Sequence, residues 1–146
     1  MSVVISGTGL FTPPNIVTNI ELVTAYNSYV DKFNTENADA IANEEVEALS
    51  YSSAEFIEKA SGIKQRYVMR KEGILDVNLM RPIIRERGND ELSLQAEIGV
   101  EAAKKALAAA NKTVADVDLI IVACAYTQRS YPAMAIEIQH ALGCGG

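Results

Sequence analysis

The sequence predicts an α/β fold in which strands and helices alternate along a single domain of 146 residues. Two apolar runs indicate strands, a short one at residues 3–5 and a longer one at residues 117–125. Apolar residues recur at helical spacing between and after these runs, and the order strand, helices, strand, helix is typical of α/β proteins. The hydrophobic fraction of 49% is enough for a core and excludes disordered and collagen-like proteins.

The composition also limits the class of protein. There are 13 Lys and Arg residues against 19 Asp and Glu, and a formal net charge of −6 argues against binding to a nucleic-acid backbone. No apolar run is long enough to cross a membrane, and no basic segment with an apolar core begins the chain. We therefore expect a cytoplasmic protein with no membrane insertion. Two cysteines do not make a disulfide framework.

The N-terminal residues predict the first strand and the helix after it. The run at residues 3–5 ends in Gly7 and Gly9, which indicates a buried strand followed by a turn that two prolines extend. Thr18 and Glu21 then match a capping box, in which a hydroxyl and a carboxylate each accept a backbone N–H at the start of a helix. The apolar residues on one face of that helix are Leu22, Tyr26, Tyr29 and Phe33.

The following segments alternate between linkers and short helices. Residues 34–43 are polar and predict a linker, and residues 44–49 predict a second, acidic helix. Ser52 and Glu55 match another capping box, which opens a short helix that Gly62 ends.

The middle of the chain combines a strand, a long loop and a helix. Residues 66–69 predict a short strand, and residues 71–89 fit no single period and predict an extended loop, a kind of segment that is often functional. A helix follows, with an Ala-rich stripe over residues 96–110 that allows a neighbour to approach closely. Glu101 and Lys105 are spaced to form an ion pair on its other side.

The second apolar run ends the predicted core. Residues 117–125 are nearly continuously apolar rather than alternating, which predicts a central strand buried on both faces, with Cys124 as an inert small side chain within it. Pro132 opens the last helix and Gly143 closes it. On that helix, His140 is expected as a surface or packing residue rather than as a base.

No catalytic or nucleotide-binding motif is complete. Gly7 and Gly9 follow a predicted strand, but position 12 is Thr and two prolines come next, so the dinucleotide fingerprint fails. A single histidine leaves no His-pair metal site. Cys144 has no neighbouring base or cation that would activate its thiol. The residues alone therefore predict an α/β domain with no visible catalytic machinery.

Several segments nevertheless form a pattern by their order and spacing along the chain. They are Ile5-Ser6-Gly7-Thr8-Gly9 with Pro13-Pro14, Thr18-Asn19 with Glu21-Leu22, Ala60-Ser61-Gly62-Ile63-Lys64-Gln65-Arg66-Tyr67, the run Leu119 to Ala123, Tyr131-Pro132, and Ile138-Gln139 with Leu142-Gly143. Together these segments resemble the N-terminal half of a β-ketoacyl-acyl-carrier-protein synthase III, a condensing enzyme of the thiolase superfamily. The similarity omits residues 34–47 and 71–89, which look like insertions relative to the short bacterial members.

The resemblance implies a fold and a reaction. The family fold is a duplicated five-layer αβαβα arrangement, so residues 1–146 would form an N-terminal thiolase-like half-domain, an incomplete mixed sheet with flanking helices, and the C-terminal half would be absent. The family transfers an acyl group from coenzyme A to a Cys and condenses it with malonyl-acyl carrier protein in fatty acid biosynthesis. It needs no cofactor, because the acyl-CoA is a substrate, and its members are usually homodimers.

The resemblance also assigns functional positions. The catalytic Cys, His and Asn are expected beyond Gly146, so this chain would hold none of them. Tyr131 matches an aromatic residue that crosses the dimer interface into the partner's acyl pocket, and Ser52 and Phe56 match positions near the coenzyme A adenine. Ala60 stands where members with short primers carry an Arg, which favours an acyl donor longer than acetyl-CoA.

Other interpretations stay open at this point. The chain could belong to a related enzyme of the superfamily, such as a hydroxymethylglutaryl-CoA synthase or a head-to-head acyl condensing enzyme. It could also belong to a non-catalytic dimer partner that keeps the fold and lacks the nucleophile, or it could be a naturally short protein. Tyr131 could cover its own core instead of a partner's pocket. The residues that separate the related enzymes and the non-catalytic partner from a synthase III are expected beyond Gly146.

Overall fold

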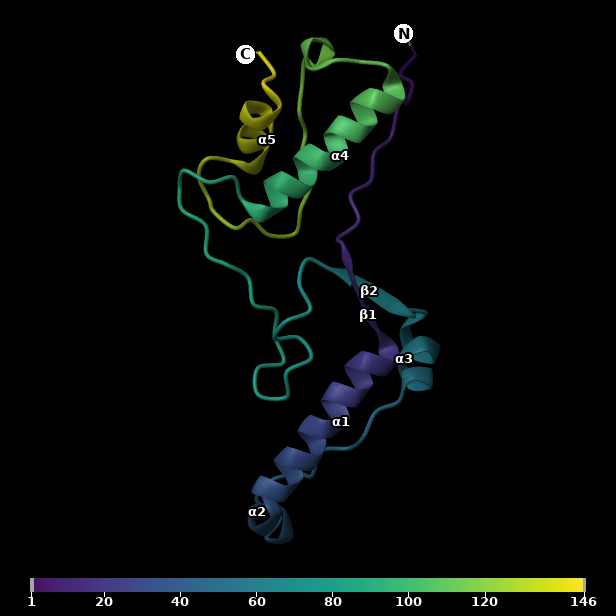
Figure 1. Ribbon diagram of the computed structural model, residues 1–146, viewed down its shortest axis with the longest axis vertical. Coiled ribbons are helices and arrows are strands. Elements are labelled where there is room, and N and C mark those ends of the chain that lie inside the picture. Colours follow the sequence, from purple (N-terminus) through teal and green to yellow (C-terminus); the bar gives the residue numbers. More distant parts are fainter. Residues whose placement is uncertain (1, 146) are drawn as a thin grey trace. The chain divides into compact units, whose positions relative to one another are not determined.

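The computed structural model describes residues 2–145 and confirms the predicted α/β class (Figure 1). The chain forms two compact units, one of residues 13–85 and one of residues 2–12 together with 86–145. The first unit holds β1 (Asn15–Thr18), α1 (Asn19–Glu36), α2 (Ala38–Ala42), α3 (Ala54–Ser61) and β2 (Gln65–Val68). The second holds α4 (Leu94–Ala110), the 3₁₀ helix η1 (Val114–Asp116) and α5 (Met134–Leu142).

The two strands of the first unit form an antiparallel pair. Asn15 lies opposite Val68 and Thr18 opposite Gln65, and the Asn15 Nδ2 also donates to the Met69 carbonyl at 2.8 Å. The strand predicted at residues 66–69 is thus confirmed within one residue. Its partner β1 occupies a segment that the sequence assigned to a turn, because the pairing joins positions some fifty residues apart and leaves no local signal.

The capping box at the start of α1 forms as predicted. The Glu21 amide donates to Thr18 Oγ1 at 3.2 Å, and the Thr18 amide donates to the Glu21 carboxylate at 2.8 Å. The helix runs to Glu36 and α2 follows almost at once, so the linker predicted at residues 34–43 is wrong. The acidic helix predicted at residues 44–49 is wrong as well, since residues 44–46 are turns and bends and residues 47–49 have no regular secondary structure.

A buried asparagine attaches the turn after α3 to the start of α1. Asn19 is 5% exposed, and its side chain donates to the Ile63 carbonyl at 2.6 Å and accepts from Arg66 at 2.8 Å. Its amide donates to the Lys64 carbonyl at 3.2 Å. These bonds fix the position of α3, because Gly62 ends that helix in the left-handed conformation at φ 72° directly before the turn.

The cap of α3 lies one residue later than the sequence suggested. The Ser53 hydroxyl, rather than that of Ser52, accepts the Phe56 amide at 3.1 Å. The backbone amide and carbonyl of Ser52 both form hydrogen bonds with the Asn27 side chain of α1. The helix therefore begins at Ala54, and Gly62 ends it as predicted.

The second unit has its core between α4 and α5. Ala96 and Val100 of α4 pack against Met134 and Ile138 of α5. Gly99 makes the close approach possible, since a Cβ at this position would lie 2.6 Å from the Ile138 side chain. The start of α5 near Pro132 and its end at Gly143 agree with the sequence.

The N-terminal segment runs along α4 without forming the predicted strand. Among residues 2–145 only β1 and β2 are paired, and Val3 is 98% exposed. A Cβ on Gly9 would lie 2.0 Å from the Ala102 carbonyl oxygen, so only glycine permits this packing against the Ala-rich helix. Lys105 donates to the Leu10 carbonyl at 2.9 Å, and Glu101 pairs with Lys104 in place of the predicted Lys105.

The apolar run at residues 117–125 is covered on one face only, which corrects the predicted central strand. Ile120 and Val122 pack on the core cluster, whereas Ile121 between them is 83% exposed. Cys124 is exposed rather than buried. A strand buried on both faces needs neighbouring strands on each edge, and the described residues place none beside this run.

Candidate functional site

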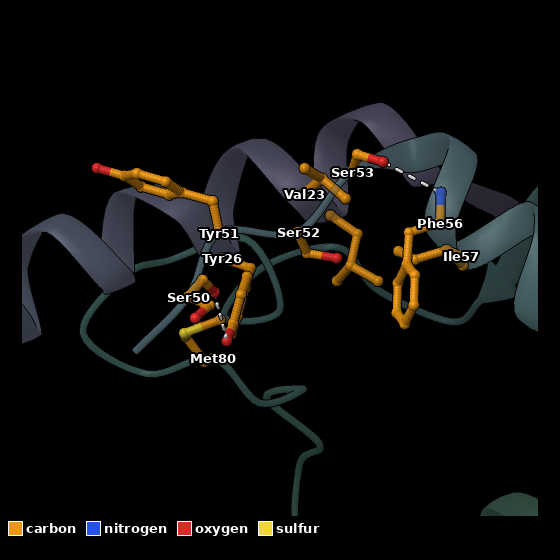
Figure 2. Close-up of a pocket in the computed structure, with 10 residues that line it drawn as sticks. Val23, Tyr26, Ser50, Tyr51, Ser52, Ser53, Phe56, Ile57 and Met80 are labelled. Atoms are coloured by element: carbon orange, nitrogen blue, oxygen red, sulfur yellow. Dashed lines mark hydrogen bonds between the residues drawn. The ribbon is translucent and has the colours of Figure 1, made fainter. Parts of the chain in front are cut away.

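A pocket of about 800 Å³ lies beside α1 in the unit of residues 13–85 (Figure 2). Its walls come from α1, from the segment before α3, from the first turn of α3 and from the long loop after β2. The residues that line it are Leu22, Val23, Tyr26, Ser50, Tyr51, Ser52, Ser53, Phe56, Ile57 and Met80.

Two asparagines of α1 hold the segment that forms one wall. The Asn27 side chain accepts the Ser52 amide at 2.9 Å and donates to the Ser52 carbonyl at 3.1 Å. Asn34 makes the same pair of bonds with Leu49, both at 2.9 Å. The two asparagines are seven residues apart, which is about two helical turns, so they lie on one face of α1. Their amides bind the segment as a neighbouring strand would.

The pocket brings together two of the three binding residues named from the sequence. Ser52 is half-buried in the wall, and Figure 2 shows its hydroxyl turned toward the Phe56 end of the pocket. Phe56 stands on the first turn of α3 and is 65% exposed. An exposed aromatic ring at the edge of a pocket can stack on a flat ligand. Their role in binding stays a prediction.

The electrostatic character of the pocket is neutral. None of the ten described residues that line it carries a charge at neutral pH. The Tyr51 hydroxyl donates to Asp31, and this bond raises the pKa of Tyr51, so the phenol is protonated at neutral pH. Apolar, aromatic and hydroxyl groups of this kind suit an uncharged, flat or apolar group rather than a phosphate.

Tyr131, the third residue named from the sequence, is not among the residues that line this pocket. It belongs to the other unit, in the segment before α5, and is 89% exposed. Arg129, two residues before Tyr131, holds the segment that carries this tyrosine. The Arg129 guanidinium donates to the carbonyls of Gly88, Asn89 and Glu91 at 3.2, 3.3 and 3.0 Å.

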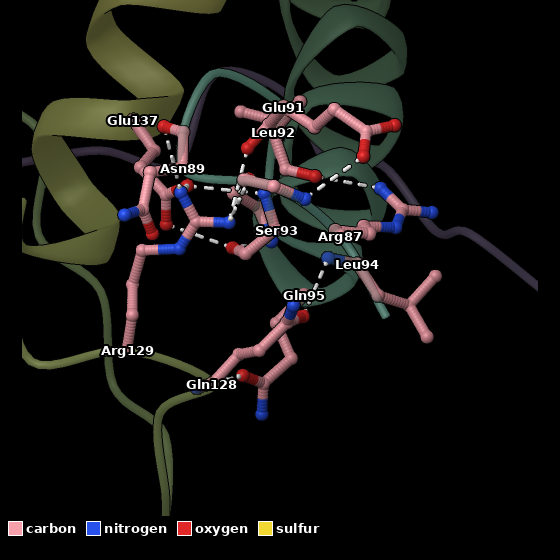
Figure 3. A network of polar contacts seen from close by, with 12 residues as sticks. Arg87, Asn89, Glu91, Leu92, Ser93, Leu94, Gln95, Gln128, Arg129 and Glu137 are labelled. Atoms are coloured by element: carbon pink, nitrogen blue, oxygen red, sulfur yellow. Dashed lines mark hydrogen bonds and ion pairs between the residues drawn. The ribbon is translucent and has the colours of Figure 1, made fainter. Parts of the chain in front are cut away.

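A buried carboxylate completes this attachment (Figure 3). Glu137 of α5 is 7% exposed and accepts both the hydroxyl and the amide of Ser93, the N-cap of α4, at 2.7 and 3.0 Å. It also pairs with Arg129 at 3.7 Å. Gln128 and Gln95 add a second link. The side-chain oxygen of Gln128 accepts the Leu94 backbone amide, and the backbone amide of Gln128 donates to the Gln95 side chain. Neither Arg129 nor Glu137 is among the functional residues predicted from the sequence.

The described residues hold no group of three or more His, Cys, Asp or Glu side chains arranged for a metal ion. Cys144 is half-buried beside a small cavity of about 210 Å³ against α5, and His140 is exposed on that helix. No helix within residues 2–145 is both long enough and apolar enough to span a bilayer.

Comparison with known proteins adds to this geometry. No family model matches the sequence. A β-ketodecanoyl-[acyl-carrier-protein] synthase of Pseudomonas aeruginosa is 53% identical over 122 residues, which cover 84% of this chain and 35% of that protein. A β-ketoacyl-[acyl-carrier-protein] synthase III of Erythrobacter litoralis is 35% identical over 106 residues, covering 73% of this chain and 27% of that protein. The enzyme of the same name from Caulobacter vibrioides is 32% identical over 143 residues, covering 98% and 31%.

This chain belongs with the N-terminal part of the β-ketoacyl-[acyl-carrier-protein] synthase III family. The resemblance found in the sequence is thereby confirmed. The chain spans about a third of the length of the curated synthases it matches.

Proposed function

We propose that this chain is the N-terminal part of a β-ketoacyl-acyl-carrier-protein synthase that takes its primer from an acyl-CoA. The observation that carries the proposal is the 53% identity over 122 residues to a β-ketodecanoyl-acyl-carrier-protein synthase. The gathering of Ser52 and Phe56 in one neutral pocket supports it, because the family resemblance assigns both positions to coenzyme A independently of their geometry. We further propose that the protein works as a cytoplasmic homodimer.

The proposed reaction has two balanced stages. A Cys thiolate attacks the thioester carbonyl of the acyl-CoA, and coenzyme A leaves as its thiolate, which takes up a proton from water. Malonyl-acyl carrier protein then loses CO₂, and its α-carbon attacks the acyl carbonyl, which forms the new carbon–carbon bond and releases the thiolate. Hydrogen-bond donors are needed for the thioester oxygens, and in this family a His and an Asn provide them. We place all three groups beyond Gly146.

The acyl donor of this protein is proposed to be of medium length. A β-ketodecanoyl product has ten acyl carbons, of which the malonyl unit supplies two, so an enzyme that makes it starts from an eight-carbon donor. Ala60 supports this choice, because it lacks the cation found at this position in members that use short primers. Tyr131 would border the acyl chain in the partner's pocket, and its 89% exposure in the single chain suits a residue that reaches outward.

The activity is tested with the complete protein, malonyl-acyl carrier protein and either octanoyl-CoA or acetyl-CoA. We expect release of coenzyme A and CO₂ with formation of β-ketodecanoyl-acyl carrier protein, measured by mass spectrometry. A preference for acetyl-CoA would overturn the proposed chain length alone. A folded protein that condenses neither donor would overturn the proposed function.

The pocket assignment is tested by the affinity for coenzyme A, measured by titration calorimetry. Phe56→Ala removes the ring proposed to stack on the adenine and should weaken binding roughly tenfold, since a base–aromatic stack contributes about 1–3 kcal/mol. Phe56→Trp should bind as well as the parent protein. Tyr67→Ala, which removes an exposed ring outside the pocket, is the matched control. Equal affinities of all variants would contradict the assignment.

A further inference from the structure

The pocket has one wall that family resemblance does not supply. Met80 lies in the irregular loop after β2, inside the segment that looks like an insertion, and every other residue that lines the pocket comes from α1 or from residues 50–57. Figure 2 shows Met80 beside Tyr26 and Ser50, at the opposite end of the row of side chains from Phe56. Met80 has φ 46°, in the left-handed region that a residue with a Cβ rarely adopts.

The loop closes on itself around Met80. The Met80 amide donates to the Asp76 carbonyl at 2.8 Å, and the Arg81 amide donates to the Gly73 carbonyl at 3.0 Å. Gly73 is required for this closure, because it has φ 80° and a Cβ there would lie 2.4 Å from the Arg81 carbonyl oxygen. The unusual backbone at Met80 is therefore held by the loop's own hydrogen bonds.

Two side-chain contacts tie this loop to α1. Lys71 forms an ion pair with Glu21 at 2.6 Å, and Lys32 donates to the Asn78 side chain at 2.6 Å. Glu21 and Lys32 are eleven residues apart, which is about three turns and roughly 16 Å along the helix, so they lie on one face. The loop is thus attached at both ends of the stretch of α1 that contributes to the pocket.

We propose that residues 71–83 form a lid over the pocket and that Met80 is a specificity-determining residue, which covers the adenine of coenzyme A together with Phe56. The thioether of Met is polarizable and packs favourably against flat rings, and an uncharged pocket suits the base better than the phosphates. This inference rests on the proposed function. It adds to that function a residue from the segment outside the family pattern.

The test compares two neighbouring residues of the lid in the complete protein. Met80→Ala should raise the dissociation constant for coenzyme A between roughly twofold and tenfold, the range that a thioether–ring contact provides. Met80→Leu should keep most of the affinity. Leu79→Ala removes an exposed apolar side chain from the same loop outside the pocket and should leave the affinity unchanged. Pantetheine, which lacks the adenine, should bind all variants equally.

A second variant tests the loop without touching the pocket. Gly73→Ala opposes the closure of the loop and should weaken coenzyme A binding as much as Met80→Ala does, while a thermal melt verifies that the protein is folded. Loss of affinity in Phe56→Ala but in neither lid variant would overturn the lid and leave the proposed function intact. Loss in none of the three would overturn the adenine assignment and the lid together. Equal losses in Leu79→Ala and Met80→Ala, or a parallel loss of pantetheine binding, would overturn the specificity role.

Discussion

In each of the two units, side-chain hydrogen bonds hold a chain segment in place. The two attachments differ in the charge and the burial of the side chains that make these bonds. In the first unit, Asn27 and Asn34 bind the backbone of the pocket wall with neutral, half-buried amides. In the second, Arg129 and Glu137 bind the segments before α4 and α5 with charged groups that are nearly buried. Removing a neutral asparagine loses only the hydrogen bonds that it makes. Removing one member of a buried ion pair also leaves the charge of its partner unpaired.

The largest effect is expected from Glu137→Leu, which removes the negative charge paired with Arg129 and leaves the Ser93 hydroxyl and amide without their acceptor. Breaking a buried ion pair in this way costs about 3–5 kcal/mol of unfolding free energy. Denaturation in urea measures it. Glu137→Gln keeps an acceptor oxygen for Ser93 and should cost clearly less. If both variants were as stable as the parent, the buried charge would have no structural role and the comparison would fail.

A smaller effect is expected from Asn27→Ala in the other unit. Two hydrogen bonds to the Ser52 backbone are lost, at about 1 kcal/mol each, and the higher helix propensity of Ala returns up to about 0.7 kcal/mol. The net destabilisation should therefore be about 1 kcal/mol by the same urea measurement. Ser28→Ala, one position further along α1 and bonded only to its own helix, is the control. A cost equal to that of Glu137→Leu would remove the distinction between the two kinds of attachment.

The smallest effect concerns the exposed ion pair between the lid and α1. The hydrogen bonds from Lys71 and from Thr18 lower the pKa of Glu21 from 4.5 to about 2. Because the folded pKa is the lower one, the stabilisation is complete above pH 4.5 and is lost as the pH falls from 4.5 towards about 2. In Lys71→Gln, a carbon-13 NMR titration should show the Glu21 pKa moving back towards 4.5. An unchanged pKa would mean that the lid contact is not made in solution.

Local patterns predicted some elements correctly. The capping box at Thr18, the end of α3 at Gly62 and the Ala-rich face of α4 follow from bonds and spacings within a few residues, which the sequence displays directly. The patternless stretch 71–89 is likewise free of helix and strand. The missed strand β1 and the single covered face of residues 117–125 depend on neighbours distant in sequence, so no local pattern could indicate them.

Some features of the candidate site were likewise predictable from the sequence and others were not. Ser52 and Phe56 were named from their place in a family pattern, and the structure adds that they line one pocket. The seven-residue spacing of Asn27 and Asn34 is visible in the sequence. The sequence does not show, however, which chain segment such an asparagine pair on a helix binds.

The sequence by itself determined the α/β class, the helix caps and the family, because these depend on spacing and on residues close together in the chain. Only the tertiary structure decided which segment Asn27 and Asn34 bind. It alone also shows that Met80 lines the pocket and that Arg129 pairs with Glu137. The physical reason is that hydrogen bonds and apolar contacts between distant residues form only where the folded backbone brings the partners within a few ångströms.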